Sequence, residues 1–185
     1  MQIDEEERKN LKDNFIAVRS LDHPNIIKYR AMYLDYKKHV SYLVMDYETK
    51  PSLKKAELIT EDSLRHIMKE LMNTIEYMHS KKVCHRDIKP DNILYDKESQ
   101  TIKIIDFGLS KKVLVRNQRR DMLTITGTLY YRAPEMFMGT GYDERIDLWS
   151  VGVTLYKIIT GHTPFESSYV STTIENILEG KVTFS

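Results

Sequence analysis

The chain has few of the features that mark secreted or membrane proteins. Cys84 is the only cysteine in 185 residues, so an internal disulfide is excluded, which fits a reducing compartment. No apolar run approaches the roughly 18 residues of a membrane span, and the mostly charged first ten residues argue against a signal peptide. The 28 basic and 27 acidic residues leave a net charge of +1, which indicates neither nucleic acid nor an anionic membrane as a partner. We therefore expect a cytoplasmic protein with no nucleic-acid or membrane partner.

Glycine is also scarce, and its distribution is uneven. The chain has 7 glycines, and the first of them is Gly108. What the chain does have, 41% hydrophobic and 30% charged residues, is typical of a globular domain. Its length is enough for one domain or for two small lobes.

Apolar periodicity predicts a mixed chain of helices and strands. Residues 4–21 form an amphipathic helical pattern that ends before Pro24, and Thr60 can cap a second helix. Alternating or apolar runs predict strands at four places, which are residues 26–34, 39–47, 92–95 and 101–106.

A third helix, at residues 146–160, is apolar nearly all round, so we expect it to be buried on most sides. Only 25 residues follow Thr160, which is too few to cover such a helix. We therefore expect covering elements to be missing and the chain to be cut short.

Polar residues that can carry chemistry gather in the stretch VCHRDIKPDNILYD, residues 83–96. Apolar residues alternate with them, which predicts a loop packed against a core. A second carboxylate, Asp106, follows a strand in IIDFG, where Gly108 permits a sharp turn. Further on come GTLYY, APE and Asp147. Each piece alone is weak, but in this order they form the protein-kinase set of motifs.

On these motifs the sequence resembles the eukaryotic serine/threonine protein kinases. It is most similar to the calcium/calmodulin-dependent group, which includes the calcium-dependent protein kinases, through LDHPNIIKY, YLVMDY, HRDIKPDNIL, IKIIDFGLS and YDERIDLWSVGVTLYKIITGHTPF. YRAPE departs from that group, because an arginine there resembles the cyclin-dependent kinases. The resemblance covers residues 10–185.

The resemblance implies an α+β, two-lobed protein-kinase-like fold. Residues 1–48 would be the remnant of a small β-rich N-terminal lobe, and residues 49–185 a mainly helical C-terminal lobe that is incomplete at its end. ATP and Mg²⁺ would be the cofactors, and a protein with a serine or threonine hydroxyl would be the substrate. Calcium- or calmodulin-linked regulation would lie outside this chain.

The resemblance also assigns catalytic roles by position. Asp87 would orient or accept the proton of the substrate hydroxyl, and Lys89 would reach the transferred phosphate. Asn92 and Asp106 would bind Mg²⁺, a hard cation that prefers oxygen ligands. Thr128 would bind Asp87 and Lys89 and mark serine/threonine specificity.

Further positions correspond to the nucleotide pocket and its support. Backbone groups of Asp46 and Glu48 would contact adenine, with Met45 at the rear of the pocket and Leu94 under the ring. His85 and Phe107 would stack in an apolar column, with Val18 and Tyr29 above them. Asp147 would hydrogen-bond the backbone near His85 and Arg86, although a plain helix cap is an alternative.

Regulation and substrate choice leave more than one interpretation. Thr124 stands where many family members are phosphorylated, and Arg86 and Lys111 could pair with a phosphate there; Thr126 is a close competitor. Ser52 replaces a glutamate that in many relatives reads a basic substrate residue. Asp91 could still select a nearer basic residue.

Several expected partners are absent from the sequence. No glycine precedes the hinge, so a glycine-rich loop over the phosphates is missing, and so is the strand with the phosphate-binding lysine. Asn14 falls where that lysine's glutamate partner is expected. Glu135 of APE lacks a later arginine, because none follows Arg145.

The leading hypothesis is therefore a protein serine/threonine kinase whose nucleotide site is incomplete in this chain. The alternative is a catalytically impaired kinase-like scaffold or binding module, suggested by Asn14. Against the scaffold, Asp87, Lys89, Asn92 and Asp106 are all present. A small-molecule kinase of similar fold is discounted, because GTLYYRAPE is expected to shape a peptide-binding ledge.

Overall fold

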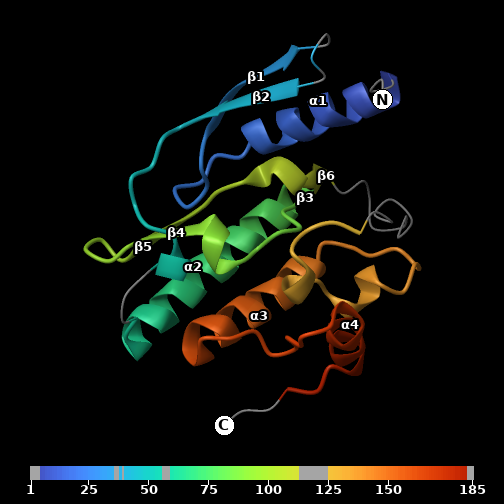
Figure 1. Cartoon of the computed structure of the whole chain (residues 1–185). Coiled ribbons are helices and arrows are strands. Elements are labelled where there is room, and N and C mark those ends of the chain that lie inside the picture. The colour runs from blue at the N-terminus through green and yellow to red at the C-terminus, as the bar shows by residue number, and fades with distance from the viewer. Residues whose placement is uncertain (1–4, 36–37, 39, 56–58, 113–124, 183–185) are drawn as a thin grey trace.

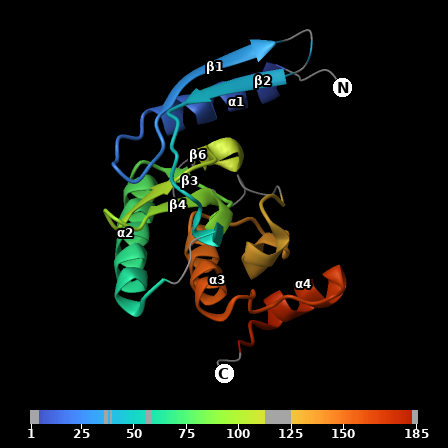
Figure 2. The same cartoon turned by 60° about the vertical axis from the view of Figure 1, so that its left-hand side comes forward.

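The computed structural model describes residues 5–35, 38, 40–55, 59–112 and 125–182. The fold is α+β: a small part with one helix and a two-stranded sheet lies over a larger, mainly helical part (Figure 1). Turning the molecule keeps this arrangement, with α1 packed against the β1–β2 sheet and α2 and α3 below them (Figure 2).

The small part is built from α1 (Glu5–Arg19), β1 (Tyr29–Asp35) and β2 (Val40–Met45). The strands pair antiparallel, and the register shifts between Tyr29 and Ala31. In the described part of the chain β2 pairs with β1 alone, and every one of its residues is exposed. A strand paired on one side leaves a row of backbone donors and acceptors open.

The larger part begins with α2 (Glu61–Ser80). The Thr60 side chain accepts a hydrogen bond from the Ser63 N–H at 3.2 Å, which confirms the predicted cap. Two short antiparallel pairs follow, β3 (Val83–Cys84) with β6 (Lys111–Lys112) and β4 (Ile93–Asp96) with β5 (Thr101–Ile104). Short 3₁₀ turns at Leu53–Lys55, Pro90–Asn92, Phe107–Leu109, Leu129–Tyr131 and Pro134–Met136 connect the segments.

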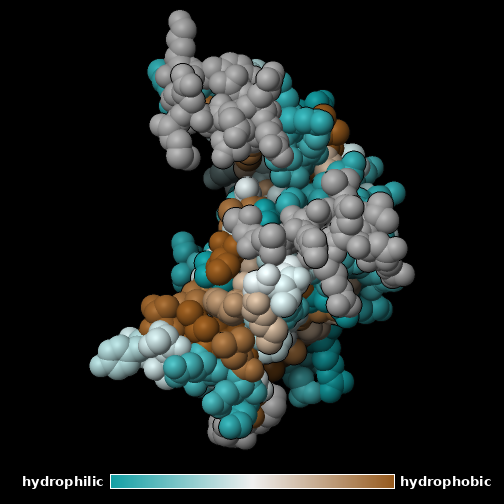
Figure 3. Space-filling model, turned by 90° about the vertical axis from the view of Figure 1, so that its right-hand side faces the viewer, coloured by the Kyte–Doolittle hydropathy of each residue, from teal (hydrophilic) through white to brown (hydrophobic). Residues whose placement is uncertain are grey.

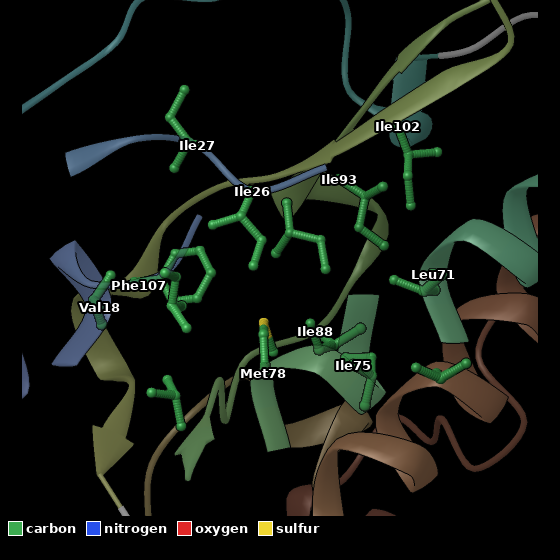
Figure 4. Packing of buried hydrophobic residues seen from close by; sticks show 14 of the residues in the cluster. Val18, Ile26, Ile27, Leu71, Ile75, Met78, Ile88, Ile93, Ile102 and Phe107 are labelled. Atoms are coloured by element: carbon green, nitrogen blue, oxygen red, sulfur yellow. The ribbon is translucent and has the colours of Figure 1, made fainter. Parts of the chain in front are cut away.

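The main core lies where α2 meets the two small parts of sheet. Its centre is formed by side chains of α2, the 85–93 loop, the β4–β5 hairpin and the segment before β1 (Figure 4). Ile88 and Ile93 in the loop are completely buried, as are Leu71 and Met78 of α2. The apolar residues between the loop's charges therefore anchor it to the core, as expected.

The last two helices are α3 (Ile146–Thr160) and α4 (Val170–Glu179). The bounds of α3 agree with the prediction, but the helix is not buried on most sides: Leu148 is 42% exposed and Ile159 is 62% exposed. A groove of about 430 Å³ follows this helix, lined by Trp149, Tyr156 and Phe165 among others. On the face shown in Figure 3, apolar side chains gather over the lower, helical part of the molecule.

Candidate active site

The carboxylate of Asp87 is the centre of the candidate site. Its Oδ1 accepts hydrogen bonds from the backbone N–H and the hydroxyl of Thr128, both at 2.9 Å. Its Oδ2 accepts from Lys89 Nζ at 2.7 Å and from Asn92 Nδ2 at 3.0 Å. The Lys89 ammonium also donates to the Thr128 hydroxyl at 2.7 Å. Four residues predicted to be catalytic are thus in one hydrogen-bonded cluster.

This network sets the charge of Asp87. Burial alone would raise the pKa of the carboxyl, but hydrogen bonds from Lys89 and Thr128 outweigh it, so the pKa lies below its usual value. Asp87 is therefore an anion near neutral pH, and a substrate hydroxyl placed beside it would meet a hydrogen-bond acceptor.

The backbone before Asp87 is held by a buried carboxylate from α3. Asp147 Oδ2 accepts from the His85 N–H at 2.9 Å, and Oδ1 accepts from the Arg86 N–H at 2.9 Å. His79 Nε2 lies 2.9 Å from the same Oδ2. These contacts confirm the predicted bond between Asp147 and the loop. Burial alone would raise the pKa of Asp147. The hydrogen bond with His79 and the nearby histidines lower it by more, so the pKa lies below its usual value.

His85 is completely buried and orients the loop from inside. Burial lowers its pKa, which favours the neutral imidazole. Nδ1 accepts from the Asp87 N–H at 3.3 Å, so Nε2 carries the proton and donates to the Ile105 carbonyl at 3.0 Å. The neutral ring therefore connects the Asp87 loop to the strand that leads to Asp106.

Asn92 and Asp106 lie at the same end of the β4–β5 hairpin. Asn92 precedes β4 and Asp106 follows β5, and since the strands are antiparallel these positions are neighbours. The Ile105 N–H donates to the Asn92 carbonyl at 3.0 Å, which ties the two segments together. The Asn92 amide nitrogen is engaged by Asp87, which leaves its amide oxygen for a cation.

An amide oxygen and an exposed carboxylate on these neighbouring segments are of the kind that binds Mg²⁺. Magnesium is usually held by one or two protein oxygens, with water and substrate phosphates completing its shell. Asp106 is exposed, and its backbone is in the left-handed region at φ 61°. No cluster of three or more His, Cys, Asp or Glu with metal-ligand geometry is found among the described residues.

Two of the four residues predicted to bind adenine, Glu48 and Leu94, line one cavity. Met45 is 40% exposed at the end of β2, and the Asp46 N–H donates to the Lys28 carbonyl at 2.9 Å. Glu48 and Leu94 line a cavity of about 300 Å³ that does not include the Asp87 cluster. The Glu48 carboxylate pairs with Lys103 at 2.8 Å. The adenine-binding roles of Met45, Asp46, Glu48 and Leu94 stay predictions.

Sequence reasoning noted Arg132 only as a departure from the expected motif, and the structure gives it a position in the site. Its Nε lies 3.0 Å from the carbonyls of Thr126 and Gly127, and Nη2 donates to the Gly127 carbonyl at 2.6 Å. These bonds hold the turn that presents Thr128 to Asp87. A charged residue between two tyrosines and Ala133 was the available signal in the sequence.

Gly127 is required in the same turn. Its φ is +82°, and a Cβ there would overlap the backbone carbonyl oxygen of Arg86. Glycine therefore allows the Thr128 turn to approach the loop that carries Asp87.

The predicted regulatory residues are only partly placed. The Arg86 Nε donates to the Leu109 carbonyl at 2.5 Å. Lys111 lies opposite Cys84 in the antiparallel pairing of β6 with β3. Thr124 lies outside the described residues.

The two positions predicted to lack their usual partners lie far apart in the sequence. Asn14 Oδ1 accepts from the Lys112 N–H at 3.2 Å, so the position predicted for a glutamate faces β6. Arg145 pairs with Asp143 at 2.8 Å, and Glu135 has no ion pair among the described residues.

A cavity of about 640 Å³ lies beside the 85–93 loop, on the side of Pro90 and Asp91. Tyr131, Lys157 and Glu166 contribute to its lining, as do Lys54 and Asp91, which form an ion pair of 2.7 Å. Burial, with Asp91 and Glu166 nearby, raises the pKa of Tyr131 to about 12, so the phenol stays protonated. This cavity is large enough for side chains of a peptide.

The fold and the Asp87 cluster together are those of the protein-kinase family. The Protein kinase domain model matches residues 1–184, and the chain belongs to that family. It is 35% identical over 182 residues to calcium-dependent protein kinase 5 of Plasmodium falciparum (isolate 3D7), covering 95% of this chain and 31% of the relative. Calcium-dependent protein kinase 4 of the same organism is 38% identical over 189 residues, covering 96% of this chain and 34% of the relative.

Another relative is mouse (Mus musculus) sperm motility kinase 3A, 38% identical over 165 residues, which covers 86% of this chain and 32% of the relative. The chain thus spans about a third of the length of the curated relatives it matches. Within the described ranges, no helix combines the length and the apolar character that crossing a bilayer requires.

Proposed function

We propose that this chain belongs to a cytoplasmic protein serine/threonine kinase. The reaction is transfer of the γ-phosphate of ATP to a serine or threonine hydroxyl of a protein, in which the hydroxyl oxygen bonds to phosphorus, the bond to ADP breaks, and the hydroxyl proton leaves. The observation that carries the proposal is the contact of Asp87 with Lys89, Asn92 and Thr128.

Each residue has a task that follows from its contacts. Asp87, an anion, orients the substrate hydroxyl and accepts its proton. Lys89 is held between Asp87 and Thr128, so its ammonium is positioned to neutralise charge on the transferred group. Asn92 and Asp106 hold Mg²⁺, which when bound neutralises phosphate charge. Thr128 holds the turn at Gly127 and Thr128 against Asp87 through its two hydrogen bonds.

The substrate protein binds in the cavity beside Pro90 and Asp91 in this proposal. Its mixed lining of apolar and charged side chains suits an extended peptide. The names of the relatives also suggest calcium-linked regulation, which we place outside this chain because the relatives are about three times its length.

One experiment tests the metal site and the transfer separately. The affinity of the chain for ATP is measured with and without Mg²⁺, and phosphate transfer to serine and threonine peptides is measured in parallel. We expect Mg²⁺ to strengthen nucleotide binding, Asp106→Asn to abolish that gain, and Asp87→Asn to retain binding while losing at least about 10²-fold in transfer. Glu76→Gln, an exposed carboxylate on α2, is the matched control.

The alternative, a kinase-like scaffold, is favoured by one observation: Asn14 rather than a glutamate faces the segment after Asp106. A scaffold predicts that Mg²⁺ has no effect on nucleotide affinity and that Asp106→Asn behaves as wild type. That result would reject the kinase proposal for this chain.

A further inference from the structure

The cavity of about 640 Å³ in which we place the substrate peptide is lined by two lysines and two carboxylates. Two of these charges match each other, because Lys54 Nζ and Asp91 Oδ1 form an ion pair of 2.7 Å. A third, on Lys157, is matched by the end of a helix: Nζ donates to the Gly161 carbonyl at 2.6 Å, just beyond the last turn of α3. The partial negative charge at the C-terminus of a helix stabilises a cation there. Glu166 carries the remaining charge.

The carboxylate of Glu166 forms no ion pair with any described residue. Its Oε2 accepts a hydrogen bond from the Thr163 hydroxyl at 2.9 Å, and a hydroxyl is a neutral donor. A carboxylate has two oxygens with about four acceptor sites between them, so most of these sites stay open to a ligand. Because Glu166 is exposed, a ligand in the cavity can reach it.

The chain on both sides of Glu166 is fixed by buried contacts. Thr163 is 4% exposed and Phe165 is 3% exposed. The Phe165 ring stacks on the Trp149 indole with centroids 5.3 Å apart, and the Asn176 amide donates to the Phe165 carbonyl at 3.3 Å. Glu166 therefore presents its charge from a fixed segment, which lowers the entropy cost of forming an ion pair.

Tyr131 connects this carboxylate with the Asp87 cluster. Its N–H donates to the Thr128 carbonyl at 3.0 Å, and its side chain contributes to the lining of the cavity. Burial raises the pKa of the phenol to about 12, and Asp91, Glu166 and Asp87 act in the same direction. The carboxylates thus outweigh the lysines at this hydroxyl, so the potential there is negative. A cationic side chain is favoured at this place, next to the residues that orient the target hydroxyl.

We propose that Glu166 is a specificity-determining residue, whose carboxylate pairs with an arginine of the substrate peptide in this cavity. This inference rests on the proposed function. Arginine suits the site better than lysine, because its planar group can donate two parallel hydrogen bonds to one carboxylate. Asp91 contributes less, since an incoming cation has to compete with Lys54 for it. At Glu166 the incoming cation meets no competing cation from the described residues.

The first test measures peptide binding without nucleotide. A set of peptides carries one arginine at successive positions around a target serine, and matched peptides carry alanine instead. We expect wild type to bind the best arginine peptide about two- to fivefold more tightly than its alanine match, the range of an exposed ion pair. Glu166→Gln keeps the size of the side chain but removes the charge, so this difference should disappear. Glu175→Gln, an exposed carboxylate on α4, should keep it.

The second test reverses the charge. Glu166→Lys should bind a peptide with glutamate at the selected position more tightly than the arginine peptide, which a general loss of folding would not produce. An unchanged arginine preference in Glu166→Gln would overturn the inference, and so would an equal loss in Glu175→Gln.

Phosphate transfer from ATP and Mg²⁺ to the alanine peptide, which offers Glu166 no cation, tests the proposed function separately. Transfer to both peptides by wild type with no preference for arginine would overturn the inference and keep the proposed function. If wild type transfers phosphate to no peptide, the proposed function fails, and the assignment of Glu166 to substrate choice fails with it.

Discussion

Lys54 and Asp91 form an ion pair of 2.7 Å, and both residues line the cavity beside the 85–93 loop. Asp91 is the carboxylate that the sequence offered as a reader of basic substrate residues. In the structure its charge is already matched by a lysine of the same chain. A cationic group on a peptide must therefore compete with Lys54 for Asp91.

The first prediction follows from this pair. Lys54→Ala should increase the preference for a peptide with arginine over one with alanine near the target hydroxyl by about two- to fivefold, since exposed ion pairs contribute about 0.2–1 kcal/mol. Relative rates or affinities for the two peptides give the measurement. Lys55→Ala, an exposed lysine one position on, should keep the wild-type ratio. An equal change in both variants would show that only net charge matters.

The second prediction concerns Arg132. Arg132→Lys keeps the charge but removes the planar group that contacts the Thr126 and Gly127 carbonyls. We expect phosphate transfer to fall about tenfold or more, because hydrogen bonds from charged groups contribute about 1.5–3 kcal/mol. Mg²⁺-dependent ATP binding should be unchanged. Arg145→Lys alters a surface pair and serves as the control; wild-type transfer by Arg132→Lys would contradict the prediction.

The third prediction compares two glycines whose backbones are both in the left-handed region. Gly127 and Gly139 have φ of +82° and +66°, but only at Gly127 would a Cβ meet other atoms. Gly139→Ala should cost about 1 kcal/mol from the left-handed backbone alone. Gly127→Ala should cost about 2 kcal/mol more, because Arg86 or the turn must shift. Urea unfolding of both variants measures the difference, and equal losses would refute the close approach at Gly127.

The fourth prediction is a pH dependence carried by His85. Its pKa is lowered by burial, with Asp147, Asp87 and Asp106 partly opposing the shift. The unfolded chain therefore binds a proton first, so the contribution of His85 to stability is complete above about pH 6.5 and is lost as pH falls through the folded pKa. The slope is at most about 1.4 kcal/mol per pH unit in that window.

The measurement is the free energy of unfolding from pH 7.5 to 5 for wild type and His85→Phe. The difference between the two proteins should shrink as pH falls, whatever its size at pH 7.5. A difference that is constant over this range would show that His85 does not stay neutral when the protein is folded.

Features that depend on neighbouring residues were the ones that the sequence predicted well. The Thr60 cap and the bounds of α3 follow from local periodicity and a polar residue next to it. The order of Asp87, Asn92 and Asp106 could be recognised because each belongs to a short motif. The bond between Asp147 and the loop was expected from the family resemblance rather than from local pattern.

Features that depend on two distant side chains were missed. The hydrogen bond from the Phe107 N–H to the Tyr29 hydroxyl joins residues 78 positions apart, and no periodicity indicates it. The pairing of Lys54 with Asp91 needs the loop and the preceding turn to be folded first. The α3 pattern predicted burial on most sides, but it carries no information about what covers each face, so the exposure of Leu148 and Ile159 could not be predicted.

The β2 strand has a consequence for how the protein behaves in a concentrated sample. Its apolar side chains, including Tyr42 and Leu43, are exposed, and one edge of the strand pairs with no other strand among the described residues. Such a strand is a template on which another copy can add in register. Turbidity and light scattering should therefore rise with concentration, and a lysine at position 42 should keep the protein monodisperse for longer.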